Sequence, residues 1–87
     1  MIDKTILIID DMKHIRDMLW LEFKQEGYLP ITAETGQKGL HYLFAKENRV
    51  DLVILDIMMP KMNGFQVLEK IRTSNDSVSQ TPVIMKI

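Results

Sequence analysis

The stretch Thr5-Ile6-Leu7-Ile8-Ile9-Asp10-Asp11 decides how this chain is expected to fold. Its apolar run is short and rich in β-branched residues, which favours a strand that is covered on both faces. A second run, Leu52-Val53-Ile54-Leu55, also ends in an acidic residue, Asp56. Open α/β sheets bind their ligands at the carboxyl ends of the strands, where these acids would lie. If the two strands are neighbours, three carboxylates share one pocket.

Such a pocket predicts a bound cation. Carboxylates that lie close together cannot all stay ionised without a compensating charge. Because Asp10, Asp11 and Asp56 offer only oxygen ligands, the expected ion is Mg²⁺.

Composition narrows the class of protein. With 87 residues, the chain has room for one small domain, residues 1–87, and its formal net charge of −1 indicates neither a nucleic-acid nor a membrane surface. The absence of cysteine excludes disulfides and thiolate metal sites and fits a cytoplasmic protein. The start, Met1-Ile2-Asp3-Lys4, is too acidic and its apolar run too short for a signal peptide, and no apolar run is long enough to span a bilayer.

Strands and helices are expected to alternate along the chain. The expected strands are Lys4–Asp10, Leu29–Ala33, Asp51–Asp56 and Val83–Ile87; the expected helices cover about Lys13–Glu26, a segment capped by Thr35 with Leu40, Leu43 and Phe44 facing inward, and a segment from near Asn63 with Phe65, Leu68 and Ile71 on one side. Ile57–Met62 and the polar segment Thr73–Gln80 are expected to be loops. This alternation predicts an α/β fold with a doubly wound parallel sheet.

Three segments together resemble one family. They are Ile6–Asp11, Leu52–Gly64 and Thr81-Pro82-Val83-Ile84-Met85, and they resemble the receiver domain of two-component response regulators over essentially the whole chain. The specific combination is an acidic pair, then an Asp at the end of the third strand, with Pro four residues and Gly eight residues beyond it. The resemblance implies the flavodoxin-like strand order 2-1-3-4-5, of which this chain would hold 2-1-3-4.

The resemblance also implies a function. Asp56 would accept a phosphoryl group from a histidine kinase or a phosphotransfer protein, with Mg²⁺ bound by Asp11, by Asp10 directly or through water, by Asp56, and by the backbone carbonyl of Met58. Such a module assists its own phosphotransfer and is a signalling protein rather than an enzyme. Kinase recognition would involve the first helix, including Ile15, Met18 and Leu19.

The chain departs from the family pattern near its end. Three strand–helix units and a fourth strand are expected, without a fourth helix, fifth strand or fifth helix. Ile87 stands where the family has Ser or Thr, and the strand-5 lysine is missing, so Lys86 or Lys61 would have to supply a cation. The alternative function is therefore a truncated receiver that cannot be phosphorylated and acts as a dimerisation or interaction module. Because the fourth strand would be an apolar sheet edge, either a homodimer through that side or marginal stability is expected.

Other interpretations of the same residues remain open at this stage. Asp11 could instead cap the first helix, and Asp11 with His14 could form part of a zinc site. A phosphohydrolase of the haloacid-dehalogenase type would need an acid at Met58. A flavodoxin-like cofactor site is disfavoured because the turn after the first strand, Asp10–His14, is acidic and lacks glycine.

Overall fold

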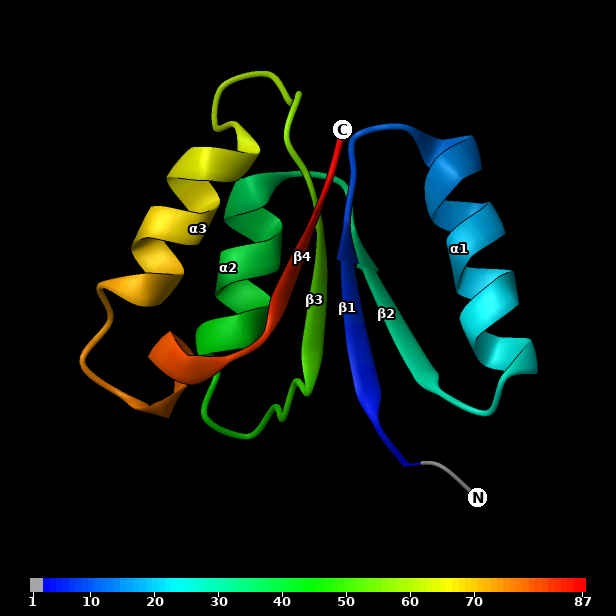
Figure 1. Ribbon diagram of the computed structural model, residues 1–87, viewed down its shortest axis with the longest axis horizontal. Helices are drawn as coiled ribbons and strands as arrows, with labels where there is room; N and C mark the ends of the chain where they lie inside the picture. Colours follow the sequence, from blue (N-terminus) through cyan, green and yellow to red (C-terminus); the bar gives the residue numbers. More distant parts are fainter. Residues whose placement is uncertain (1–2) are drawn as a thin grey trace.

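A four-stranded parallel sheet in the order β2-β1-β3-β4 forms the centre of the molecule (Figure 1). This computed structural model describes residues 3–87. The strands are β1 Thr5–Ile9, β2 Leu29–Ala33, β3 Leu52–Asp56 and β4 Val83–Lys86; the helices are α1 Lys13–Gln25, α2 Gly36–Phe44, α3 Gly64–Arg72 and the 3₁₀ helix η1 Ser77–Gln80. The predicted fold class and strand order are confirmed.

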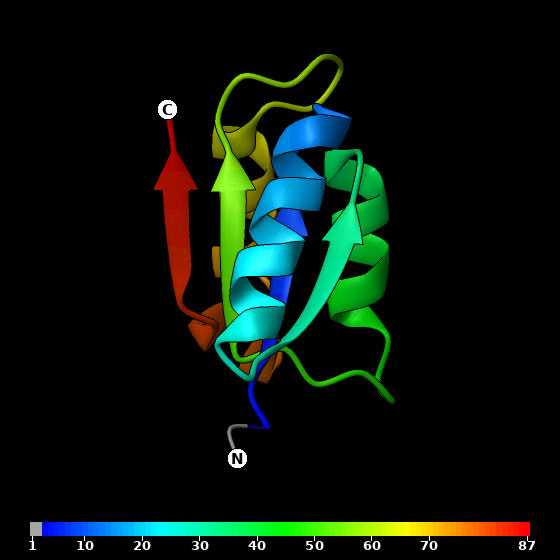
Figure 2. The same cartoon turned by 90° about the vertical axis from the view of Figure 1, so that its right-hand side faces the viewer.

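The helices cover the sheet unequally. Figures 1 and 2 show α1 alone on one face, with α2 and α3 together on the other. The arrows of β2, β3 and β4 in Figure 2 point toward the end of the sheet where the loop after β3 lies, and β1 runs parallel to them. Consequently the residues that follow β1 and β3 are brought to the same edge.

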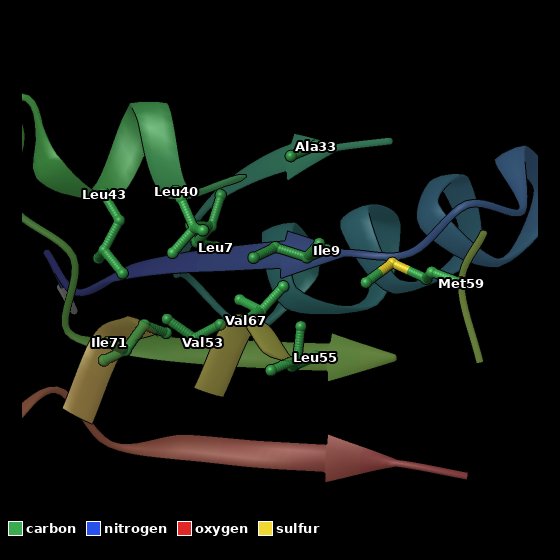
Figure 3. Packing of buried hydrophobic residues seen from close by; sticks show 10 residues of the cluster. All are labelled: Leu7, Ile9, Ala33, Leu40, Leu43, Val53, Leu55, Met59, Val67 and Ile71. Atoms are coloured by element: carbon green, nitrogen blue, oxygen red, sulfur yellow. The ribbon is translucent and has the colours of Figure 1, made fainter. Parts of the chain in front are cut away.

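The larger part of the core lies between the sheet and the two-helix layer (Figure 3). Its buried members are Leu7, Ile9, Ala33, Leu40, Leu43, Val53, Leu55, Met59, Val67 and Ile71. Alternate residues of β1 and β3 point into this layer because successive side chains of a strand face opposite sides of the sheet. This packing holds the carboxyl ends of β1 and β3 in a fixed relationship.

The apolar layer between the sheet and α1 contains fewer buried residues than the layer under α2 and α3. Its buried residues are Ile6, Ile8 and Ile54, and Leu19, Phe23, Tyr28 and Leu52 are partly buried against them. None of the residues Lys13–Gln25 is itself fully buried. The rings of Phe23 and Tyr28 meet edge to face at 5.9 Å and close the end of this layer where α1 turns into β2.

Two aromatic residues do not lie where the sequence predicts: Phe44 was expected to face inward, and Phe65 to share one side of its helix with Leu68 and the buried Ile71. Phe65 is 60% exposed and Phe44 is also exposed, so these two predictions were wrong. The buried positions of α3 are Gly64, Val67 and Ile71, which follow the three- and four-residue spacing of one helical face. Phe65 immediately follows Gly64 and therefore lies about 100° around the helix from that face.

The predicted cap of α2 is confirmed, and α3 begins next to Asn63, where its start was expected. Thr35 accepts a hydrogen bond from the Lys38 amide and begins α2. Asn63 precedes α3 and forms a reciprocal capping box with Gln66, with hydrogen bonds of 3.0 and 2.9 Å.

The predicted loop Thr73–Gln80 contains a short helix. Its last four residues form η1, which Asp76 caps through a hydrogen bond from the Val78 amide. Arg72 donates to the carbonyl oxygens of Ser79 and Thr81 and so ties the end of α3 to the entry of β4.

The fourth strand forms one edge of the sheet. Within residues 3–87, β4 pairs only with β3, and Ile84 on this strand is 55% exposed. The expected apolar edge is therefore present, while association through it remains a prediction. Over the same residues, no helix combines the length and apolar character that crossing a membrane requires.

Candidate metal centre

Three carboxylates meet at the carboxyl edge of the sheet. One carboxylate oxygen from each of Asp10, Asp11 and Asp56 lies within 4.8 Å of the others. The proximity follows from the parallel pairing of β1 with β3, which places Ile9 opposite Leu55 just before the acids. Asp10 is 1% and Asp56 is 7% exposed, whereas Asp11 is exposed to solvent. The structure thus brings the predicted ligand side chains together.

Asp10 is held from three directions. Its amide donates to the Ala33 carbonyl at 3.1 Å, its Oδ1 accepts from the Met12 amide at 2.9 Å, and its carbonyl accepts from Arg16 at 2.8 Å. Its second carboxylate oxygen, Oδ2, is buried and accepts no hydrogen bond from the described residues. A buried carboxylate oxygen in this state requires a charge partner, because its desolvation is otherwise uncompensated.

The alternative role of Asp11 as a helix cap is wrong. The cap position of α1 is Met12, which has no side-chain capping bond, and the side chain that accepts an amide at this turn is that of Asp10. Asp11 is thereby left with its carboxylate free to face the cluster, as its proximity to the other two acids indicates.

Lys86 is the cation that reaches this cluster. Its Nζ lies 3.0 Å from Asp10 Oδ2, in an ion pair whose geometry is not that of a hydrogen bond. The sequence left the choice between Lys86 and Lys61 open. The parallel register, which places Lys86 directly opposite Asp56, selects Lys86, and this register is a feature of the structure and not of the sequence.

The pKa of Asp56 is raised above its usual value of 3.8. Burial is the main cause, and the negative charge of Asp10 adds to it, with a smaller contribution from Asp11. Lys86 and the Met58 amide oppose this rise in pKa. Ionisation of Asp56 is therefore less favourable than ionisation of an exposed aspartate, and an added positive charge would lower its pKa.

The position eight residues after Asp56 requires glycine, and the structure shows why. A Cβ at this position would lie 2.4 Å from the carbonyl oxygen of Asp56 and 2.8 Å from the Cα of Ile57, so only glycine fits without a backbone shift. The Gly64 amide donates to the Ile57 carbonyl at 2.9 Å. The start of α3 is thus packed directly against the backbone that carries Asp56.

The connecting loop is tightly turned. The Met62 amide donates to the carbonyl of Pro60 at 2.7 Å, and between them Lys61 has a φ of 67°, in the left-handed region. Met58, the predicted backbone ligand, lies in the same loop with an exposed side chain. Ligation by its carbonyl oxygen remains a prediction.

The zinc alternative gains no support. Among residues 3–87, the three aspartates are the only group of three or more acids, histidines or cysteines close enough to share an ion, and this group contains no histidine. His14 is an exposed residue of α1. An all-oxygen donor set suits a hard cation rather than zinc.

The family of this chain follows from comparison with known proteins. The family model of the response regulator receiver domain matches residues 6–86, so the chain belongs to the receiver-domain family of two-component response regulators. The resemblance seen in the sequence is thereby confirmed.

Similar full-length proteins are considerably longer. The chain is 42% identical over 82 residues to the probable transcriptional regulator ycf27 of Guillardia theta, covering 94% of this chain and 30% of that protein. It is 38% identical over 80 residues to the transcriptional regulatory protein CpxR of Escherichia coli K12, covering 92% and 32%. The chain thus spans about a third of the length of these relatives.

Solved structures share the fold. The N-terminal domain of a response regulator receiver protein from Methanoculleus marisnigri JR1 is 42% identical with a TM-score of 0.85, over 93% of this chain and 63% of that one. The response regulator TrrA from Thermotoga maritima, solved in complex with Mg²⁺-BeF, is 33% identical with a TM-score of 0.78, over 97% and 87%.

Proposed function

We propose that this chain is a phosphoacceptor module that receives a phosphoryl group on Asp56 with the help of Mg²⁺. The observation that carries the proposal is the group of three carboxylate oxygens within 4.8 Å at the carboxyl edge of a receiver-type sheet. The Mg²⁺-BeF complex of TrrA supports the choice of ion and of phosphoryl chemistry by analogy.

The residues present fit Mg²⁺. Asp10, Asp11, Asp56 and the Met58 carbonyl would supply oxygen ligands, and the buried Asp10 Oδ2 lacks a hydrogen bond among the described residues. Magnesium usually retains several waters, so a few protein ligands suffice. When bound, the ion would neutralise charge between the Asp56 carboxylate and the oxygens of the incoming phosphoryl group.

The chemical step is a displacement at phosphorus. An Asp56 carboxylate oxygen attacks in line and forms the new P–O bond, while the P–N bond of a phosphohistidine donor breaks and its electron pair stays on the histidine nitrogen. Packing of Gly64 against the Asp56 backbone and the buried position of β3 hold the nucleophile in place.

The partners follow from this chemistry. The donor would be a histidine kinase or a phosphotransfer protein, encountered in the cytoplasm, and Met18 on α1 offers an exposed apolar contact for it. The chain would assist its own modification and turn over no separate substrate, so it acts as a signalling module rather than an enzyme.

A second candidate is an interaction module that is not phosphorylated. Among the described residues, the strand β4 pairs only with β3 and carries the exposed Ile84. An exposed apolar residue on an edge strand favours association with a second copy or another protein.

Magnesium titration followed by a phosphodonor separates the two candidates. Calorimetry should detect Mg²⁺ binding to the 87-residue chain and its loss in Asp11→Asn, while Asp17→Asn, an exposed acid paired with Lys13 on α1, should bind normally. Acetyl phosphate should then modify the chain only with Mg²⁺ present, as measured by mass spectrometry, and Asp56→Asn should stay unmodified. Binding without modification supports the interaction module, and absent binding contradicts the metal site.

A further inference from the structure

Lys86 lies on β4, and its side chain reaches past β3 to contact the acidic cluster. It ends β4 and pairs in register with Asp56 of β3, yet its Nζ lies 3.0 Å from Oδ2 of Asp10, which follows β1. The lysine side chain is 32% exposed and the Asp10 side chain 1% exposed. The lysine therefore approaches from the solvent side and places its charge at the buried carboxylate.

This ammonium is the charge partner of the cluster. Between residues 3 and 87, Lys86 is the basic residue that forms an ion pair with any of the three aspartates. Arg16, the other nearby cation, donates instead to the main-chain carbonyl of Asp10. Because Asp10 Oδ2 accepts no hydrogen bond from the described residues, the lysine supplies its close compensating contact.

We propose that Lys86 is a tethered counter-ion that competes with Mg²⁺ for Asp10, so that metal binding displaces the ammonium. The inference deepens the proposed function, since it rests on the cluster being a Mg²⁺ site. An ammonium in contact with Asp10 Oδ2 repels a divalent cation in the same cluster and occupies the Asp10 oxygen that no hydrogen bond engages among the described residues. The affinity for Mg²⁺ is thereby set below that of the three carboxylates alone.

The flexible side chain of Lys86 allows its ammonium to leave Asp10 when Mg²⁺ binds. Four flexible carbons carry the ammonium, and the one-third exposure of the side chain lets the charge move into water without a backbone change. Asp10 itself cannot move in the same way, because its amide, carbonyl and Oδ1 are all hydrogen-bonded. The lysine is thus the mobile partner and the carboxylate the fixed one.

Calorimetric titration with MgCl₂ tests the competition directly. Lys86→Met should bind Mg²⁺ about tenfold more tightly than the unchanged chain, a coupling typical of two linked ligands. Lys61→Met is the matched control: it removes the same charge from the loop at the same end of the sheet, and Lys61 forms no ion pair among the described residues. Titrations at about 0.15 M KCl screen long-range effects.

The outcomes separate this inference from the proposed function. Equal affinities for Lys86→Met and the unchanged chain, or equal tightening by Lys86→Met and Lys61→Met, would overturn the competition while leaving the metal site intact. Absence of Mg²⁺ binding in all forms would overturn both. Lys86→Arg retains the charge and should bind within about threefold of the unchanged chain; if it tightens as Lys86→Met does, the role assigned to the charge is wrong. Matching NMR spectra before titration confirm that each variant is folded.

Discussion

Gly64 and Asp56 are in direct backbone contact, because a Cβ on Gly64 would lie 2.4 Å from the Asp56 carbonyl oxygen. The contact joins the first residue of α3 to the last residue of β3, on either side of the loop Ile57–Met62. A side chain added at Gly64 must therefore move the backbone of Asp56, the start of α3 or both.

Gly64→Ala should destabilise the fold by about 2 kcal/mol or more, since the added methyl meets main-chain atoms rather than a flexible side chain. It should also weaken Mg²⁺ binding by shifting Asp56. Urea denaturation and calorimetry measure the two effects.

Gly27→Ala is the control for that substitution. Gly27 has a φ of 93° after α1, and a Cβ at this position would have no atom of the described residues within 4 Å, so alanine should cost about 1 kcal/mol through backbone strain alone. Its Mg²⁺ affinity should be unchanged. Equal loss of affinity in both variants would contradict a special role for Gly64.

Asp56→Asn should stabilise the metal-free chain near neutral pH. The raised pKa of Asp56 means that ionisation is less favourable in the folded than in the unfolded state. Its contribution to stability is therefore present below about pH 3.8 and is lost as the pH rises through the raised pKa. The stability gap between Asp56→Asn and the unchanged chain should widen over this interval and then level off.

Thermal unfolding over a pH series measures this gap, with about 4–8 °C expected for each kcal/mol in a domain of this size. Because both chains contain all the other carboxylates, the pH dependence that those groups cause cancels in the difference between the two stabilities. Saturating Mg²⁺ should reverse the order by stabilising only the unchanged chain. A gap that does not depend on pH would argue against the assigned ionisation.

Asn63→Ala should destabilise the chain by about 1 kcal/mol, because it removes one of the two hydrogen bonds of the capping box at the start of α3. Denaturant unfolding provides the measurement. Asn75→Ala, at an exposed position in the loop before η1, should change stability by less than about 0.5 kcal/mol. Similar losses in the two variants would show that the cap contributes little.

Ile84→Lys should reduce self-association of the 87-residue chain. Ile84 is exposed on the edge strand β4, and a lysine there discourages pairing between sheet edges. Sedimentation velocity over a range of concentrations should detect dimers of the unchanged chain and fewer of the variant. Phe65→Lys, on α3, is a matched change of another exposed apolar residue and should leave the dimer in place. A monomer at all concentrations would refute the prediction.

Much of the fold was predictable because local signals and topology agree. Short β-branched runs marked β1 and β3, and their parallel direction followed from strand–helix alternation. Their adjacency came from the resemblance to the receiver family. The meeting of Asp10 with Asp56 then required only that these strands be neighbours. The glycine eight residues after Asp56 was part of the motif, although its contact with the Asp56 carbonyl became visible only in the structure.

The remaining features depend on three-dimensional details. The outward position of Phe65 depends on the rotation of α3 against the sheet, which Gly64 and Val67 determine. The reach of Lys86 to Asp10 crosses β3, so sequence distance carries no signal for it. The choice of Asp10 rather than Asp11 as the acceptor of the Met12 amide depends on the turn geometry after β1.

Helix α1 contributes no fully buried side chain from Lys13 to Gln25 and rests on the sheet through partly covered residues such as Leu19 and Phe23. Its outer positions, including Met18, can therefore change identity with little penalty to the rest of the domain. Substitutions on this outer side of α1 should therefore leave the spacing of the three carboxylates unchanged, because none of the aspartates depends on a buried α1 side chain for its position.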